Sequence, residues 1–354
     1  MLQPRCVFTV IGCLCGAVLV IIFQIPYEPT TTDRWVGVVT RYQLGNVLWQ
    51  LASSHGVARR RNARWCVIDG DGWYSQYKAY LEWPHGPPET CPGWNLVMPP
   101  LLRYSQLFEF VPYDGCAVYT NEFLQAPFPR ILMTGCLQAY RHFLDGPLPF
   151  QLTAKSRALG WVAEHNVTAA IHVRRGDKLT AFANIVPPLH YYYLAVAMLQ
   201  RRHPREQQRF VVCTDDPAWV SGHPFFKDML LLNSQDPSFD MAVISACKHK
   251  IISIGTFGWW GAFLGEPDST VIYPLPQVED VWKTRFHNED YFPQPWISIE
   301  YITPSLISAE SDGGPVSKRA ENNRCTLPIQ VLRIPFLFQG SHPASLNCLW
   351  HYYY

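Results

Sequence analysis

Short apolar runs alternate with helix-like stretches in the first part of the chain. Residues 35–39 and 65–68 carry almost only apolar or small side chains, as buried strands do. Between them, residues 47–62 repeat apolar side chains at the spacing of one helix face and end in three arginines, which suit a helix carboxyl terminus. This strand–helix–strand order predicts the opening of a parallel, nucleotide-binding-like sheet.

The alternation is clearer in the second half, whereas residues 69–146 are rich in proline, glycine and aromatic side chains and show weak periodicity. The predicted strands are 171–173, 210–213, 251–254 and 271–274, and the predicted helices are 189–202, 241–248 and 257–264. Strands that alternate with helices in this way indicate a doubly wound parallel sheet. Beyond Thr303 the chain turns to serine, glycine and charged residues, which predicts a tail outside the core.

The segment from Cys6 to Ile25 is almost free of polar side chains and is just long enough to span a bilayer as a helix. Arg5 precedes it and Glu28 and Asp33 follow it, a bias that favours a cytosolic amino terminus. We therefore expect a signal anchor with the rest of the chain in an oxidising lumen. A cleaved signal peptide is the alternative, although the run is long for one and no small-x-small cleavage site follows it.

Charge and cysteine usage limit the remaining classes. The chain has 29 basic and 28 acidic residues, so no overall field points to nucleic acid. Eight of the 11 cysteines lie after residue 25 and none forms a C-x-x-C pair, a pattern that argues against zinc and indicates disulfides. Asn166 begins the one N-x-[ST] sequon, so it is the predicted glycosylation site.

Two adjacent arginines follow the apolar run 169–173, in the sequence AAIHVRRGDK. An open α/β sheet binds ligands at the carboxyl ends of its strands, and two guanidiniums there suit a diphosphate. Gly176 would let the backbone turn or approach the ligand closely. The alternatives are a strand followed by a solvated turn and, for the Arg-Gly-Asp tripeptide, an adhesion signal.

A second segment, SIGTFGWWG from Ser253, runs from a predicted strand through a glycine-containing turn into a helix. Free backbone N–H groups and the positive helix end would face an anion placed there, and Thr256 adds a hydroxyl donor. The alternative is that the glycines only permit tight packing. Upstream, Asp240 stands near the start of a predicted helix, where it is either an N-cap worth about 1 kcal/mol or an acceptor for the edge of a guanine.

The segments HVRRGDK, FDMAVISACKH and GTFGWWGAFL together resemble the GDP-fucose-dependent fucosyltransferases, above all the α1,2-fucosyltransferase family. The resemblance covers residues 36–295. It implies an α/β fold of two facing Rossmann-like domains, GT-B-like, which would follow the single transmembrane helix. It also implies inverting transfer of L-fucose from GDP-fucose to a glycan hydroxyl, above all O2 of a terminal galactose. A fixed arginine at the leaving phosphate would make a metal unnecessary, and no cofactor is expected. Together with the apolar segment 6–25, the resemblance predicts a type II membrane protein of the Golgi.

The resemblance also implies roles for individual residues. Arg174 would bind the β-phosphate and stabilise the leaving GDP, and Arg175 would order the loop that faces the diphosphate. His172 and Asp240 would read the guanine, and Asp177 is the nearest candidate for the general base. The residues expected to line the phosphate–fucose pocket are Ser253, Gly255, Thr256, Phe257 and Gly258.

The predicted organisation is a cytosolic tail (1–5), the anchor (6–25), a short stem (26–34), an acceptor-side domain (35–160), a GDP-fucose-binding domain (161–303) and a tail (304–354). Three alternatives stay open. The chain could fucosylate another position or a protein side chain, or it could be a non-catalytic lumenal glycan-binding protein. Asp69 and Asp71 could also hold a metal ion, because hard cations prefer carboxylate oxygens, although Asp-Gly-Asp is equally an ordinary turn.

Overall fold

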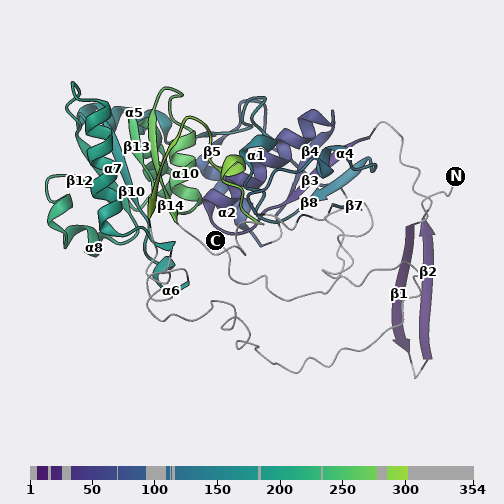
Figure 1. Ribbon diagram of the computed structural model, residues 1–354. Helices are drawn as coiled ribbons and strands as arrows, with labels where there is room; N and C mark the ends of the chain where they lie inside the picture. The colour runs from purple at the N-terminus through teal and green to yellow at the C-terminus, as the bar shows by residue number, and fades with distance from the viewer. Residues whose placement is uncertain are drawn as a thin grey trace, which may run out of the picture.

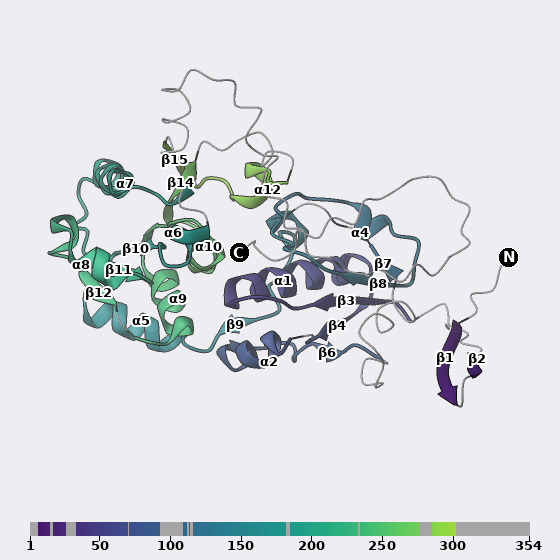
Figure 2. The same ribbon diagram turned by 90° about the horizontal axis from the view of Figure 1, so that it is seen from below.

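The first half of the chain forms a parallel five-stranded sheet in the computed structural model, which describes residues 6–14, 17–25, 33–69, 71–92, 109–111, 113, 116–181, 185–232, 234–276 and 285–301. Its strand order is β6-β4-β3-β8-β7. The strands are β3 (Trp35–Val39), β4 (Arg64–Ile68), β6 (Glu89–Thr90), β7 (Glu109–Phe110) and β8 (Arg130–Met133). Helix α1 (Leu44–Arg60) connects β3 to β4 (Figure 2), which confirms the predicted strand–helix–strand unit.

The second half forms a parallel six-stranded sheet with the order β12-β11-β10-β13-β14-β15. The alternating pattern predicts the parallel class, but it misses the strands at 230–232 and 297–301, and its strand at 251–254 overlaps the observed one only at Ile251. Its strands are β10 (Ala169–Val173), β11 (Phe210–Thr214), β12 (Leu230–Leu232), β13 (His249–Ile251), β14 (Thr270–Pro276) and β15 (Ile297–Tyr301). The longer helices around it are α5 (Lys155–Glu164), α7 (Leu189–Arg202), α9 (Pro237–Ala246) and α10 (Thr256–Phe263).

Shorter elements complete the described part of the chain. The short helices are α2 (Trp73–Tyr77), α4 (Glu122–Gln125), α6 (Lys178–Ala181), α8 (Pro217–Ser221) and α12 (Asn288–Tyr291), with 3-10 turns at Lys78–Tyr80, Tyr140–His142 and Pro224–Phe226. Strands β5 (Leu81–Glu82) and β9 (Gln151–Leu152) pair antiparallel. The predicted boundary after residue 160 falls within α5, and this helix lies beside α9 in the second unit (Figure 2).

The two sheets lie side by side, with α1 and α10 between them (Figure 1). Trp49 of α1 packs against Trp259 of α10 with ring centroids 4.1 Å apart. The indole N–H of Trp260 donates a hydrogen bond of 2.9 Å to the carbonyl oxygen of Gly45. One continuous apolar cluster runs across this contact, so burial of the same side chains holds the two units together.

The amino-terminal segment differs from the prediction. Residues 6–14 and 17–25 form two antiparallel strands, β1 (Cys6–Leu14) and β2 (Ala17–Ile25), apart from both sheets in Figure 1, where one helix was predicted. Valine and isoleucine dominate the segment, and β-branched residues favour strands. Within the described ranges no helix combines the length and the apolar character needed to cross a membrane. The predicted cytosolic tail (1–5), most of the stem and the tail 304–354 lie outside the described residues.

Two of the expected disulfides are present, Cys66–Cys91 and Cys116–Cys136. Cys213 and Cys247 are free and buried, and Cys325 and Cys348 lie outside the described residues. Asn166 is exposed in the turn between α5 and β10, in left-handed backbone with φ 51°. Its glycosylation stays a prediction.

Candidate active site

A cavity of about 440 Å³ opens between the two units, at the carboxyl ends of β10 and β11 and the amino ends of α1 and α10. Its volume is typical of a small-molecule site. The polar residues that line it are Gln43, Asn46, His172, Arg174, Lys178, Thr214, Asp215, Ser234, Gln235, Asp240 and Thr256. The cavity therefore lies where an open parallel sheet places its ligands.

Arg174 carries the positive charge at the end of β10. Its guanidinium forms ion pairs with Asp215 on one nitrogen and with Asp177, at 2.5 Å, on the other. Asp215 also accepts a hydrogen bond of 2.8 Å from the backbone N–H of Arg175. Because Asp215 holds both the side chain and the turn, it fixes Arg174 toward the cavity, whereas Asp177 is half exposed and lies outside the lining residues.

Arg175 points elsewhere, so the sequence-based picture of two guanidiniums on one diphosphate needs correction. Its guanidinium stacks 4.1 Å from the ring centroid of Trp219 and donates to Asp216 at 3.2 Å. Neighbouring side chains of an extended chain point to opposite sides. Arg175 thus anchors the turn to α8, a geometry compatible with the loop-ordering role implied for it, and Arg174 alone of the pair lines the cavity.

The glycine-containing turn before α10 forms one wall. Gly255 has φ 92°, a conformation that favours glycine, and it leads into Thr256 and Phe257 at the first turn of the helix. The hydroxyl oxygen of Ser253 accepts a hydrogen bond of 3.4 Å from Tyr192 and is buried behind this wall. Of the predicted pocket residues, Gly255, Thr256 and Phe257 line the cavity, and Ser253 lies behind it.

His172 and Gly258 pack directly against each other. Burial, and secondly the charge of Arg174, lowers the pKa of His172 to about 4, so the ring is neutral near pH 7. Its Nδ1 atom is buried without a hydrogen-bond partner in the structure. A β-carbon added to Gly258 would stand 2.3 Å from this nitrogen, so the position has no room for a side chain.

We expect Gly258→Ala to destabilise the fold by about 1–3 kcal/mol, because overpacking displaces the ring beneath it. Gly160→Ala in α5 is the matched control, since its added β-carbon meets nothing within 4 Å. That control should be about 0.5–1 kcal/mol more stable than the parent, because alanine favours the helix over the unfolded chain. Urea unfolding measures both, and equal stability of the two variants would contradict the packing argument.

Asp240 is not the cap of its helix. The side chain of Asp236 accepts from the backbone N–H groups of Ser238 and Phe239 and so begins α9, with Pro237 in the first helical position. Asp240 lies one turn later, lines the cavity and accepts a hydrogen bond of 2.5 Å from Ser234. Burial raises the pKa of Asp240 above its usual value. The N-cap alternative is therefore wrong, and Asp240 faces the cavity.

Sequence reasoning missed some of the lining residues. Gln43 and Asn46 come from the start of α1, and the amide of Gln138 donates to Asn46 at 2.9 Å. Their one signal in the sequence is Leu44-Gly45-Asn46, which follows the apolar run 35–39 as a turn does. Lys178 is buried, and burial lowers its pKa. It stands three residues after Arg175 in the sequence.

Asp69 and Asp71, the carboxylate pair considered for a metal ion, lie in a turn before α2. Asp69 accepts hydrogen bonds of 2.9 Å from the backbone N–H groups of both Tyr74 and Ser75 and so caps α2. Asp71 is exposed. Neither carboxylate lines the cavity, so the ordinary turn is the interpretation that fits.

Comparison with known proteins places the second unit in a family. Residues 155–300 match the model of glycosyl transferase family 11. The chain is 30% identical over 138 residues to the galactoside 2-alpha-L-fucosyltransferase Sec1 of Mus musculus, which is 36% of this chain and 37% of that one. It is 22% identical over 287 residues to the galactoside 2-alpha-L-fucosyltransferase of Caenorhabditis elegans, covering 74% and 78%.

Among solved structures, the chain is similar to the fucosyltransferase NodZ from Bradyrhizobium, with 17% identity, a TM-score of 0.42 and coverage of 66% of this chain and 94% of that one. The matches to the mouse and cattle Sec1 proteins span little more than a third of those relatives, 37% of each. The match to the family model contains Arg174, Asp240 and the turn before α10. The chain is thus a homologue of the galactoside α1,2-fucosyltransferases, with a glycosyl transferase family 11 region at residues 155–300.

Proposed function

We propose that the chain transfers L-fucose from GDP-fucose to a glycan hydroxyl, with inversion, and that the acceptor is O2 of a terminal galactose. The observation that carries the proposal is Arg174, held by Asp215 at the mouth of a nucleotide-sized cavity between two parallel sheets. Two carboxylates hold this guanidinium at the cavity lining, where it is one-fifth exposed and placed to meet an anionic ligand. The names of the homologues, galactoside fucosyltransferases, support the sugar and the acceptor class.

Arg174 would stabilise the departing GDP. In the proposed reaction the bond between C1 of fucose and the β-phosphate oxygen breaks, and a bond from C1 to the acceptor oxygen forms on the opposite face. Negative charge grows on the phosphate as the sugar becomes oxocarbenium-like. A fixed donor at such a position lowers the barrier by about 3 kcal/mol or more, and the guanidinium supplies this charge without a metal.

Asp177 remains the proposed general base, which takes the proton from the acceptor hydroxyl. Its carboxylate is more exposed than that of Asp215. Its partners in the structure are Arg174, the cation that the diphosphate would engage, and the ammonium of Lys178 at 3.7 Å. Once the phosphate engages Arg174, Asp177 keeps only the longer contact with Lys178, whereas Asp215 keeps its hydrogen bond from the backbone N–H of Arg175. Asp177→Asn should lower turnover and leave GDP affinity unchanged; normal turnover would remove it from the role.

The guanine would lie at the other end of the cavity, against Asp240. An ionised carboxylate accepts hydrogen bonds from the N1–H and amino groups of guanine, which adenine does not present in that arrangement. Neutral His172 lies beside the same wall. Asp240→Asn should therefore weaken GDP binding more than it weakens ADP binding, and an equal effect on both nucleotides would contradict the assignment.

We also propose that the chain works in the lumen of the Golgi. The two disulfides fit an oxidising compartment, and the exposed sequon at Asn166 fits lumenal glycosylation. A glycosidase-sensitive change in mass that Asn166→Gln abolishes would place this region in the lumen. If the wild-type chain made in secretory cells shows no glycosidase-sensitive change in mass, this result would count against that location.

The function is tested by GDP release from GDP-fucose in excess EDTA, with and without a galactose-terminated acceptor. We expect release that depends on the acceptor, with a glucose-terminated glycan as the matched control. Saturable GDP binding without release on any acceptor would favour the non-catalytic glycan-binding protein. Loss of release in EDTA with recovery in Mn²⁺ would contradict the metal-free mechanism, and absence of GDP binding would overturn the assignment as a whole.

A further inference from the structure

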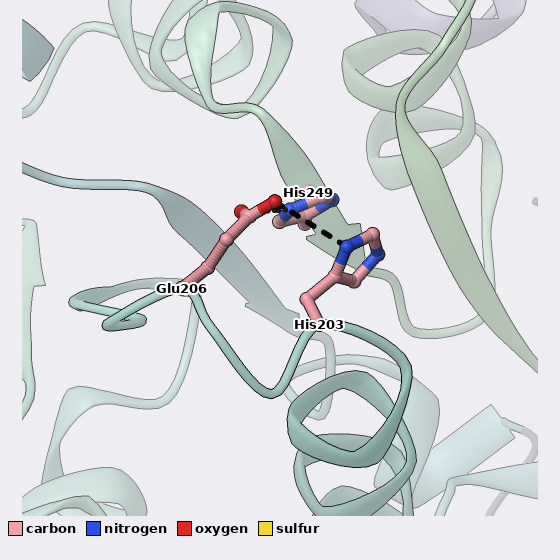
Figure 3. Close-up of side chains that lie close together, drawn as sticks. All are labelled: His203, Glu206 and His249. Carbon is pink, nitrogen blue, oxygen red and sulfur yellow. Dashed lines mark hydrogen bonds and ion pairs between the residues drawn. The ribbon is translucent and has the colours of Figure 1, made fainter.

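Two histidines and a glutamate lie together where the strands of the second sheet begin, at the end opposite the cavity. Figure 3 shows the three side chains. His203 follows the last residue of α7, Glu206 lies in the loop that leads to β11, and His249 is the first residue of β13. In a parallel sheet the amino ends of the strands lie opposite the carboxyl ends, where the cavity opens. The cluster is therefore separate from the chemistry proposed for Arg174.

The spacing of the three side chains fits a metal ion. Nδ1 of His203 lies 3.4 Å from one carboxylate oxygen of Glu206, and Nε2 of His249 lies 3.1 Å from the other. The ligand atoms all lie within 4.8 Å of one another. Tetrahedral zinc with bonds of about 2.1 Å holds its ligand atoms about 3.4 Å apart, so an ion fits here after small side-chain rotations.

The surroundings of the cluster already orient one of its ligands. Nε2 of His203 lies 2.9 Å from the hydroxyl of Thr270, the first residue of β14. When this nitrogen is protonated and donates a hydrogen bond to the hydroxyl, Nδ1 is unprotonated and its lone pair points toward Glu206. Such a second partner is what fixes the ring of a metal-bound histidine.

The three side chains differ in exposure, so one side of the cluster is buried and the other faces solvent. His249 is 1% exposed and forms the floor, whereas the side chains of His203 and Glu206 are 22% and 32% exposed. An ion could thus enter from solvent, and water could complete its coordination. To bind, His249 would carry its proton on Nδ1 and coordinate through Nε2.

We propose that His203, Glu206 and His249 form a binding site for a zinc ion, or for a similar divalent transition metal, that stabilises the second unit. Two imidazoles and one carboxylate select such ions over magnesium or calcium, which prefer oxygen ligands only. The ion would join the loop after α7 to the start of β13. This proposal is independent of the proposed transferase activity.

Lys248 would compete with the ion for Glu206, so removing its charge should raise zinc affinity, whereas removing a ligand should lower it. Its ammonium lies 2.8 Å from Oε1 of Glu206 and is more than half exposed, so it can move aside. Removing the ammonium should make Glu206 a better ligand. Lys248→Gln should therefore tighten zinc binding by up to about fivefold, the size of a surface ion pair.

The experiment is calorimetric titration of the metal-free full-length chain with ZnCl₂, alongside Co²⁺ absorption to report coordination. We expect one saturable site, a thermal midpoint raised by zinc, and affinity lowered at least about tenfold by His203→Gln and by Glu206→Gln. His190→Gln, which changes an exposed histidine of α7, should leave binding unchanged.

Three outcomes would overturn the site. They are the absence of saturable binding, affinity that Glu206→Gln leaves unchanged, and affinity that Lys248→Gln leaves unchanged or weakens. Because Lys248 is exposed, its variant keeps the proposal testable even where a change at His203 or Glu206 lowers the folded fraction.

Discussion

Arg174→Ala is expected to lower turnover at least about a hundredfold, because it removes the fixed positive charge that faces the leaving diphosphate. The fold should remain intact, since the guanidinium contributes ion pairs with Asp177 and Asp215 and no core packing. Loss of a donor that acts mainly in the transition state lowers kcat and kcat/KM together. Steady-state GDP release with a galactose-terminated acceptor, together with circular dichroism, measures both parts of the prediction.

Two further variants make this test specific. Arg174→Lys keeps the charge and loses the planar fork, so we expect it to recover only part of the activity. Arg201→Ala removes an exposed arginine of α7 and should leave turnover unchanged. Near-normal turnover of Arg174→Ala would remove the diphosphate assignment, and equal losses from Arg174→Ala and Arg201→Ala would indicate a general effect of net charge.

Trp260→Ala is expected to lower the free energy of unfolding by about 3–5 kcal/mol, the usual cost of deleting a buried tryptophan. Trp260 is fully buried, and its ring packs against Trp49, Phe143 and Phe150 of the first unit. Its N–H also donates to the carbonyl oxygen of Gly45. A change of this size is a large fraction of the stability of an ordinary domain, about 5–15 kcal/mol, and urea unfolding would show it as a lower midpoint.

Trp260→Phe separates packing from the hydrogen bond. It keeps an aromatic ring and leaves the Gly45 carbonyl without its donor, so it should cost less than Trp260→Ala and more than about 1 kcal/mol. Phe128→Ala is the control for aromatic area on the surface, since that ring is 40% exposed. If Trp260→Ala were as mild as Phe128→Ala, the contact of α1 with α10 would not be what joins the two units.

Local pattern predicted strands β10, β11 and β14 of the second sheet, because they are buried and contain short apolar runs. It missed the more exposed β12 and β15, and the strand predicted at 251–254 begins where β13 ends. The bounds of helix α7 are those expected from its spacing, and β3 likewise. Helix α9 shows the limit. It begins four residues before the expected start because the Asp236-Pro237 pair caps it, and the apolar pattern alone does not reveal which acid accepts from the free N–H groups.

The same limit applies to the residues of the site. The sequence indicates that charged groups follow the strand ending at Val173, yet it does not say that Arg174 faces the cavity while Arg175 turns to Trp219. That choice depends on Asp215 and Asp216, which are about 40 residues away in the sequence and adjacent in the sheet. The paired strands β1 and β2 differ from the predicted helix for a related reason. In a uniformly apolar run, polar residues do not recur at a spacing that would distinguish a strand from a helix.

The sequence by itself determined the parallel α/β class, most of the strands and helices in the second half, and the two segments that end at the cavity. Each of these follows from local periodicity and from turn chemistry within a few residues. Only the tertiary structure decided which side chains share the cavity and that α1 closes it from the first unit. It alone also brought His203, Glu206 and His249 together. These arrangements depend on packing between segments far apart in the chain, and a local sequence pattern does not predict which distant segments pack together.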